Sequence, residues 1–204
     1  MRYSDTHKQE TRKKVVRAAA AAVRVKGPDG VGVAEIMAEA GLTHGGFYAH
    51  FPNKEALVAA AVEEAFGQSR RRFARMTEGM APGEALTAFV ESYVSSDHRD
   101  NPQRGCPIST LTSDLPRQGP LVRRAFDTGV ANLIARLEAW LPERDPAARR
   151  TLASSLMAEM AGAVALARAV SDERLAEQLL DASRTRIKAR AGLAGVAGAV
   201  TSSP

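Results

Sequence analysis

The chain has 204 residues, of which 45% are hydrophobic and only 5% aromatic, and its formal net charge is +5. This length and apolar content suffice for a sizeable core, while the single cysteine, Cys106, excludes an internal disulfide and fits a reducing compartment. The longest apolar or small runs, such as residues 161–167 and 191–200, are far shorter than the roughly 18–20 residues that span a bilayer, and the charged N-terminus has no signal-peptide core, so we expect a soluble, cytoplasmic protein without a membrane partner.

Helical periodicity and frequent alanine predict an all-α fold of about nine helices, because no strand-length alternation of apolar and polar residues occurs. The expected helices cover residues 8–26, 33–40, 44–50, 54–77, 84–96, short segments around 108–115, and then 119–141, 146–170 and 172–191. Residues 1–7 are expected to fray, residues 96–107 to form a polar loop, and the Gly/Ala-rich residues 192–204 to form a flexible tail.

The segment from Val33 to Lys54 predicts a helix-turn-helix. Gly41 follows an amphipathic helix at the position where a left-handed residue ends it. Leu42 can then fill the turn, and the hydroxyl of Thr43 can cap a short second helix that Pro52 stops. Two helices joined by a three-residue turn form the unit whose second helix enters the major groove of DNA.

The charge of the chain is concentrated on the segment that carries this motif. Residues 1–54 hold 9 Lys/Arg against 5 Asp/Glu, whereas residues 55–204 hold 19 against 18. Most of the positive excess therefore lies where phosphates would be met, although a basic helix can also be merely solvated.

The run from Ala40 to Leu57, AGLTHGGFYAHFPNKEAL, resembles the recognition segment of tetracycline-repressor (TetR) family regulators. Their pattern is roughly A-G-[VL]-[ST]-x-G-x-[FL]-Y-x-H-F-x-x-K-x-x-L, and every fixed position matches. The resemblance implies a DNA-binding domain over residues 1–54 and a helical effector-binding and dimerisation domain over residues 55–191. It also implies a homodimeric, ligand-responsive regulator, most often a repressor, that binds a palindromic operator in double-stranded DNA and is released by a small apolar effector.

Spacing divides the residues of the recognition segment between the core and the DNA. Phe47 and Phe51 are four residues apart and form the natural core pair. The polar residues that remain for phosphate contacts, three of which (the Tyr, His and Lys) contact the DNA backbone in the family that the segment resembles, are Thr43, Tyr48, His50 and Lys54.

Base reading is assigned to His44, Gly45 and Gly46 at the start of the second helix. Two glycines there disfavour a helix by roughly 1 kcal/mol each relative to alanine, but they permit close backbone approach to bases while His44 offers a polar contact. Ala49 stands where many relatives carry a longer, often basic residue, so one phosphate contact is absent.

The C-terminal part provides candidates for an effector cavity between helices, although each candidate is also an ordinary core residue. Cys106 is either a small buried hydrophobe or a thiol that responds to electrophiles, with only Arg104 nearby in sequence to lower its pKa. The candidate ligand-binding residues are Phe89, Tyr93, Cys106, Phe126, Met157 and Met160.

The last two long helices are rich in small residues, which allow close helix packing. Two such helices from each subunit would form a four-helix dimer interface, as the family resemblance implies. Leu156 and Leu179 are the bulky residues that we expect in that interface.

Other classes of function remain as alternatives. A low-specificity, nucleoid-like DNA-binding protein would share the same fold, and a basic helix on an anionic membrane would need a more apolar opposite face. An enzyme could use His98 and Cys106 as base and nucleophile, but these residues are equally a solvated loop, so no catalytic residue is predicted. The histidines show no metal-ligand spacing and no phosphate-binding glycine loop occurs, so no metal and no cofactor is predicted.

Overall fold

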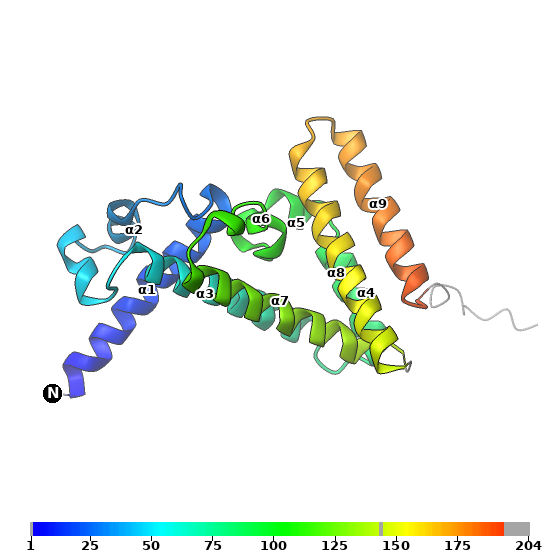
Figure 1. Cartoon of the computed structure of the whole chain (residues 1–204), viewed down its shortest axis with the longest axis horizontal. Coiled ribbons are helices and arrows are strands. Elements are labelled where there is room, and N and C mark those ends of the chain that lie inside the picture. Colours follow the sequence, from blue (N-terminus) through cyan, green and yellow to red (C-terminus); the bar gives the residue numbers. More distant parts are fainter. Residues whose placement is uncertain (1, 143–144, 194–204) are drawn as a thin grey trace, which may run out of the picture. The chain divides into compact units, whose positions relative to one another are not determined.

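The computed structural model describes residues 2–142 and 145–193. Within these residues all the regular secondary structure is helical, which confirms the predicted fold class (Figure 1). Nine α-helices and three short 3-10 helices make up these residues. In chain order they are α1 (Arg2–Lys26), α2 (Val33–Glu39), η1 (His44–Ala49), α3 (Lys54–Met76), α4 (Pro82–Tyr93), α5 (Ser96–Asp100), η2 (Pro102–Arg104), α6 (Ile108–Leu111), η3 (Leu115–Arg117), α7 (Pro120–Trp140), α8 (Pro146–Ala169) and α9 (Glu173–Arg190).

The helices group into two compact units, which divide the chain differently from the predicted domains 1–54 and 55–191. The first unit comprises the described residues of Met1–Arg72 and Asn101–Ala131, and the second comprises those of Phe73–Asp100 and Asn132–Pro204. The first unit thus contains the predicted helix-turn-helix together with most of α3 and the segment η2 to α7. Most of the predicted tail, residues 194–204, lies outside the described residues.

Two sequence predictions about helix boundaries are wrong. Helix α1 begins at Arg2, so the backbone of residues 2–7 is helical rather than frayed. Residues 96–107 contain α5 and η2 instead of a continuous polar loop, and both His98 and Arg99 are buried. The charges in this segment suggested solvation, but they are matched by partners distant in sequence, as described below.

The core of the first unit is formed by one face of α1 and by the elements that follow it. Val15, Ala19 and Val23 are fully buried, as the spacing predicts, and pack in one cluster with Ile36 and Leu57. This packing fixes α2, η1 and the start of α3 against α1 (Figure 1). The predicted helix-turn-helix is therefore held by a shared apolar core.

Arg24 also lies in this unit and is only 4% exposed, although its position off the apolar stripe suggested solvent. Its guanidinium donates to the carbonyl oxygens of Ala20 and Gly105 at 2.9 Å each and to Gln68 Oε1 at 2.5 Å. Burial, and secondarily the charge of Arg72, lowers the pKa of Arg24 to about 10. The arginine thus joins α1 to α3 and to the end of η2.

Helices α3 and α7 of the first unit pack through a glycine notch. The ring of Phe66 lies against Gly129 so closely that a Cβ on this glycine would be 2.2 Å from the ring, and Phe126 contacts Phe66 edge-on at 5.7 Å between ring centroids. The Glu55 carboxylate accepts the backbone N–H of Leu121 at 3.0 Å and so caps α7. Helices α3 and α7 are therefore joined by the contact of Phe66 with Gly129 and by the hydrogen bond from Leu121 to Glu55.

Replacing Gly129 with alanine is expected to lower the free energy of unfolding by about 1–3 kcal/mol, because an overpacked core displaces the ring or the backbone. Chemical denaturation followed by circular dichroism would measure this loss. The double variant Gly129→Ala/Phe66→Leu should recover stability, since the smaller side chain makes room for the methyl group. A wild-type stability for Gly129→Ala alone would show that the notch is not required.

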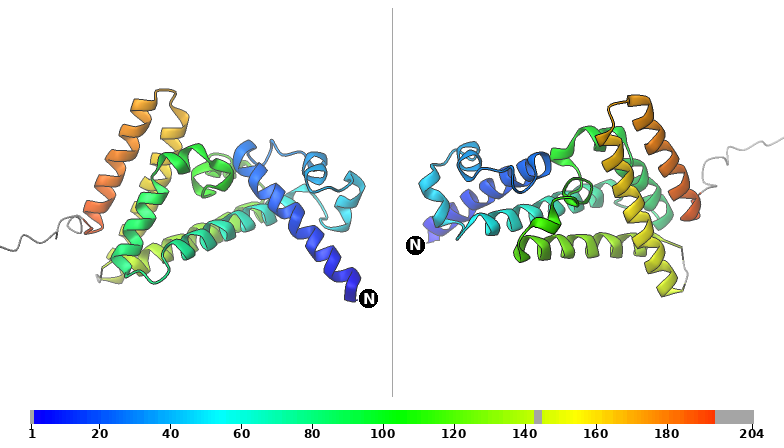
Figure 2. Two further views of the ribbon diagram at one scale, coloured as in Figure 1. Left: turned by 180° about the vertical axis from the view of Figure 1, so that it is seen from behind. Right: turned by 45° about the horizontal axis from the view of Figure 1, so that its top comes forward.

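The second unit is built on α8 and α9, which lie side by side and antiparallel, and on α4, which packs against both (Figures 1 and 2). Its core contains aromatic residues from α4 and small or sulfur-containing residues from α8. The fully buried large side chains include Leu86, Phe89, Tyr93, Leu156, Met160 and Leu180.

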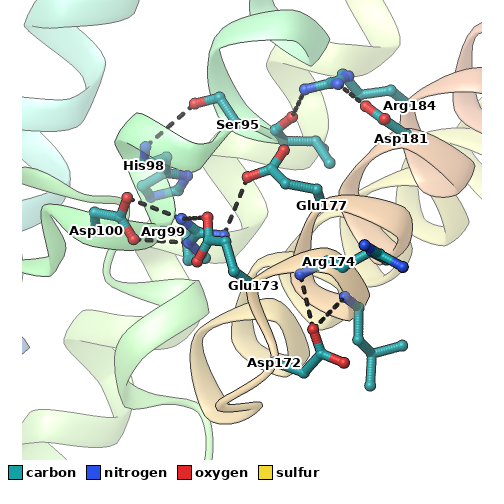
Figure 3. Close-up of polar contacts among 12 residues, drawn as sticks. Ser95, His98, Arg99, Asp100, Asp172, Glu173, Arg174, Glu177, Asp181 and Arg184 are labelled. Carbon is teal, nitrogen blue, oxygen red and sulfur yellow. Dashed lines mark hydrogen bonds and ion pairs between the residues drawn. The ribbon is translucent and has the colours of Figure 1, made fainter.

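Helix α5 is fixed to α8 by Arg168 and to α9 by Arg99, whose ion pairs Figure 3 shows. Arg99 is 6% exposed and pairs with Asp100 at 2.7 Å, Glu173 at 2.8 Å and Glu177 at 3.1 Å. Arg168 of α8 donates to the backbone carbonyls of His98 and Arg99 at 2.9 and 2.8 Å, near the C-terminal end of α5. These contacts explain why a charged five-residue segment is helical and buried.

Helix α8 is the one described helix that is long and apolar enough, by length and composition, to cross a membrane, with a mean hydropathy of 1.2 in an 18-residue window. Its flank is charged, since Glu159 pairs with Arg190 of α9 at 2.5 Å and Arg168 is bound as described above. A core helix packed against α9 accounts for its apolar composition.

Candidate nucleic-acid interface

The turn of the helix-turn-helix is closed as the sequence predicts. Gly41 has a left-handed φ of +75°, and its N–H donates to the carbonyl of Ala38 at 2.9 Å. The N–H of Leu42 donates to the carbonyl of Met37 at 2.8 Å, which completes the paired bonds of a Schellman motif. The side chain of Leu42 packs against the core. The end of α2 and the start of the next segment are therefore fixed by local bonds.

The second element of the motif differs from the prediction, because η1 is a six-residue 3-10 helix instead of an α-helix. Thr43 occupies the N-cap position, but its side chain makes no capping bond; the N–H of Gly46 donates to the Thr43 carbonyl at 3.1 Å instead. Gly45 and Gly46 disfavour a regular α-helix, and the tighter 3-10 turn is common in such short pieces.

Phe47 and Phe51 form the predicted core pair, and each is 2% exposed. Their rings stack at 5.8 Å between centroids, and the guanidinium of Arg12 lies over the Phe51 ring at 4.7 Å. Tyr48 lies between them in sequence but is 72% exposed. Burial of the two phenylalanines thus turns the other face of η1 to solvent.

The start of η1 is open. Thr43, His44 and Gly45 are exposed, and a Cβ placed on Gly45 would meet no atom within 4 Å. A Cβ on Gly46 would lie 3.6 Å from Met37 Cε, an ordinary contact distance. The backbone at Gly45 can therefore be approached closely by a flat partner such as a base edge.

Lys54 begins α3 next to this surface, and its ammonium donates to the backbone carbonyl of Asp29 at 3.2 Å. Asn53 caps the helix, because its side-chain oxygen accepts the N–H of Ala56 at 2.9 Å. The N-terminus of α3 consequently presents a positive helix end together with a lysine, an arrangement suited to a phosphate.

His50 is half-buried beside the basic face of α1. Its Nδ1 atom is buried without a hydrogen-bond partner among the residues that the structure describes, so it is not a satisfied core histidine. Burial lowers the pKa of His50 below its usual value, and the charges of Lys8 and Arg12 lower it further. An anion bound at this point would oppose all three effects.

Four of the six candidate ligand-binding residues belong to the second unit, where they are packed core: Phe89, Tyr93, Met157 and Met160. Phe89 contacts Phe73 at 4.5 Å and the half-buried Trp140 at 5.5 Å between ring centroids. Tyr93 contacts the ring of His98 edge-on at 4.6 Å. These residues form an aromatic cluster that sequence spacing alone only partly indicated, because Phe73, His98 and Trp140 join it from other helices.

The other two candidates, Cys106 and Phe126, belong to the first unit. Phe126 lines a pocket of about 200 Å³ together with Leu115, Pro116 and Arg123, among others. Cys106 is fully buried, and its charge interaction with Arg24 means that Arg104 is not the only arginine relevant to the thiol. The sequence could not indicate Arg24, which is 82 positions away.

The residues of the alternative catalytic arrangement are not brought together within either unit. His98 lies in the second unit, 5% exposed, with Nδ1 at 2.6 Å from the carbonyl oxygen of Tyr93. Cys106 lies in the first unit and is fully buried. His98 and Cys106 therefore belong to different units.

Comparison with known proteins covers both parts of the chain. Residues 15–61 match bacterial regulatory proteins of the tetR family, and residues 82–185 match the C-terminal domain of LmrA/YxaF-like transcriptional regulators. The HTH-type transcriptional regulator LmrA of Bacillus subtilis is 28% identical over 118 residues, which are 57% of this chain and 63% of LmrA. The chain thus spans less than two thirds of the length of that relative.

Solved structures extend the likeness over most of the chain. A TetR transcriptional regulator from Chloroflexus aurantiacus is 30% identical, with a TM-score of 0.73 over 90% of this chain and 96% of that one. A TetR-family regulator from Cytophaga hutchinsonii is 21% identical, with a TM-score of 0.75 over 90% and 96% of the two chains, and shares the fold.

Proposed function

Because the chain belongs to the TetR family of bacterial transcriptional regulators, we propose that it represses transcription in the cytoplasm, as a homodimer bound to a palindromic operator. The observation that carries the DNA-binding part is the orientation of η1. Phe47 and Phe51 are buried, so His44, Gly45 and Tyr48 are left together on the exposed side. Two such elements in a dimer would enter successive major grooves.

The proposed contacts fall into two classes. Thr43, Tyr48, His50 and Lys54 bind phosphate oxygens, which sets affinity without reading sequence. His44 reads a base edge, and the open backbone at Gly45 and Gly46 allows η1 to approach the bases closely. Because this reading set is small, DNA shape contributes to the choice of operator.

Selection of bound duplexes from a random pool tests this proposal. A specific regulator enriches a palindrome whose half-sites are about 10 base pairs apart, centre to centre, or a multiple of that. Recovery of unenriched sequence, bound with strong salt dependence, would instead identify a low-specificity, nucleoid-like protein.

Substitution of His44 and of Lys54 should have different consequences. His44→Ala is expected to weaken operator binding by about 1–3 kcal/mol and to change binding to random DNA little, because only a base contact is lost. Lys54→Ala should weaken both and reduce the slope of log affinity against log salt by about 1.8, since each of the two subunits loses one phosphate contact at about 0.9. Fluorescence anisotropy titrations at several salt concentrations measure both effects, and identical patterns for the two variants would refute the division of roles.

We assign the dimer interface to the outer face of α8 and α9. Leu166 is 57% and Leu175 is 42% exposed, which is unusual for large apolar side chains. A Cβ on Gly162 would meet no atom within 4 Å, and Ala158 and Ala165 are exposed on the same helix. Leu179 is half-buried and remains a candidate, whereas Leu156 is fully buried inside its own subunit and belongs to the core instead.

We further propose that a small apolar or partly aromatic effector binds within the helical part and lowers DNA affinity through linked conformational change. The six candidates stay as proposed: Phe89, Tyr93, Cys106, Phe126, Met157 and Met160. Support comes from the aromatic cluster, which joins apolar surface to the polar groups of Tyr93 and His98, as ligand sites commonly do. The cluster also contains Trp140, the single tryptophan of the chain, at 5.5 Å from Phe89.

Two matched substitutions test where the effector binds. Phe89→Leu is expected to weaken effector binding about tenfold, because one aromatic contact is lost. Phe126→Leu makes the same substitution in the first unit and is the matched variant. Quenching of Trp140 fluorescence by the compound that releases operator DNA reports binding directly. If only Phe126→Leu or Cys106→Ser abolishes release, the effector acts in the first unit or through the thiol, contrary to this expectation.

A further inference from the structure

A second basic surface lies in the first unit, outside the helix-turn-helix segment. It is a groove of about 600 Å³ between α1 and α3, open to solvent. Its floor is apolar and narrow, formed by Val16, Ala60 and the buried Gly67. Its charged rim consists of Arg12, Lys13, Arg17, Glu63, Glu64, Arg70 and Arg71.

The rim carries five cations against two carboxylates, and one carboxylate is already engaged. Glu64 accepts from Arg71 at 2.9 Å and from Gln68 at 3.1 Å. Lys13, Arg17 and Arg70 are exposed and form no ion pair with any residue that the structure describes. The groove therefore has an excess of positive charge that nothing within the described residues neutralises.

The groove is continuous with the candidate nucleic-acid interface. Arg12 lines the groove and also lies over the ring of Phe51, which follows η1 directly. Together with Lys8 it is close enough to His50 to lower the pKa of the imidazole. Basic side chains thus run without interruption from His50 along α1 into the groove.

We propose that this groove binds the phosphate backbone of the duplex that flanks each operator half-site. The inference rests on the proposed function and adds a second, sequence-independent contact to it. Duplex DNA fits the observations because its backbone is a regular line of negative charges, one per about 1.7 Å of axis. Lys13 and Arg17 on α1 and Arg70 on α3 are exposed cations that can pair with such a line. A duplex bound by η1 would also lie next to Lys8 and Arg12, and Arg12 lines the groove.

The test compares two duplexes that contain the palindrome isolated by selection, one trimmed to the enriched sequence and one with about one helical turn of added DNA on each side. Arg17→Gln/Arg70→Gln should reduce the salt slope on the longer duplex by about 3.6, because each of the two subunits loses two phosphate contacts at about 0.9 each. On the trimmed duplex the slope should stay that of the unmodified protein. Because both arginines are exposed, folding should be unaffected.

Two controls isolate the groove from general charge. Arg117→Gln/Arg124→Gln makes the same charge change at exposed positions outside the groove in the same unit and should leave both slopes unchanged. Arg17→Lys/Arg70→Lys retains the charges and should restore the slope on the longer duplex. An unchanged slope for the glutamine variant, or an equal decrease on both duplexes, would overturn the proposal and assign the groove to another anion.

Failure of the proposed function gives a different result. If the random pool yields no enriched sequence, the specific-regulator proposal fails by itself. The salt slope is then measured on a mixed-sequence duplex of about 40 base pairs, which is long enough to extend beyond the contacts of a single DNA-binding module. There the Arg17→Gln/Arg70→Gln variant must still show the smaller salt slope, and the Arg117→Gln/Arg124→Gln control must not.

Discussion

A Leu166→Asp variant is expected to be a folded monomer that binds operator DNA at least about a hundredfold more weakly than the unmodified dimer. Leu166 is 57% exposed in the subunit, so an aspartate there is solvated before association. In the proposed interface each subunit would bury one unpaired charge, at about 3–5 kcal/mol, and each 1.4 kcal/mol corresponds to a factor of about ten in affinity. Loss of the dimer removes the simultaneous engagement of two half-sites.

Sedimentation velocity at micromolar concentration and circular dichroism of the same samples decide the result. Leu156→Asp is the matched control, because the same substitution at a fully buried position of α8 should unfold the subunit rather than only separate it. A Leu166→Asp protein that remains dimeric would place the interface elsewhere on the chain. An unmodified protein that is a folded monomer would remove the argument for two-site docking.

Phe51→Ala is expected to lower the free energy of unfolding by about 3–5 kcal/mol, the usual range for truncating a buried phenylalanine. Phe51 is 2% exposed, stacks on Phe47 and supports Arg12, so the cavity would lie directly beneath η1. With a total stability of about 5–15 kcal/mol for a typical domain, this loss should leave the DNA-binding segment partly unfolded at physiological temperature.

Tyr48 follows Phe47 directly in the chain but is 72% exposed, so Tyr48→Ala should change stability by less than about 0.5 kcal/mol. It should nevertheless weaken binding to operator and random DNA alike, since a phosphate contact is lost. Thermal unfolding combined with anisotropy titrations separates the two variants. Equal destabilisation by both would mean that Tyr48 is structural and that η1 presents a different face.

Local sequence was sufficient wherever a few consecutive residues fix the structure. Gly41 supplies the left-handed residue that closes the turn, and Asn53 caps α3 through a neighbouring N–H. The spacing of Phe47 and Phe51 placed one face of η1 in the core, and with it the exposed position of Tyr48. These features depend on bonds and contacts within about five positions, so the order of residues determines them.

The sequence pattern did not predict that η1 is a 3-10 helix. The recognition pattern predicts a second α-helix, whereas two adjacent glycines weaken it. In the observed 3-10 helix Phe47 is nevertheless buried, while His44, Gly45 and Tyr48 are exposed. The assignment of candidate DNA contacts therefore does not depend on the helix type.

Tertiary structure decided the features that depend on partners distant in sequence. Periodicity shows which residues share a helix face but not what covers that face, so Leu156 was predicted in the interface although it is fully buried, whereas Leu166 of the same helix is 57% exposed. Arg24 and Arg99 looked like solvated charges, yet each is buried because carbonyls and carboxylates from other elements satisfy its guanidinium. Such long-range compensation leaves no local pattern in the sequence, since the partners are chosen by how the helices pack.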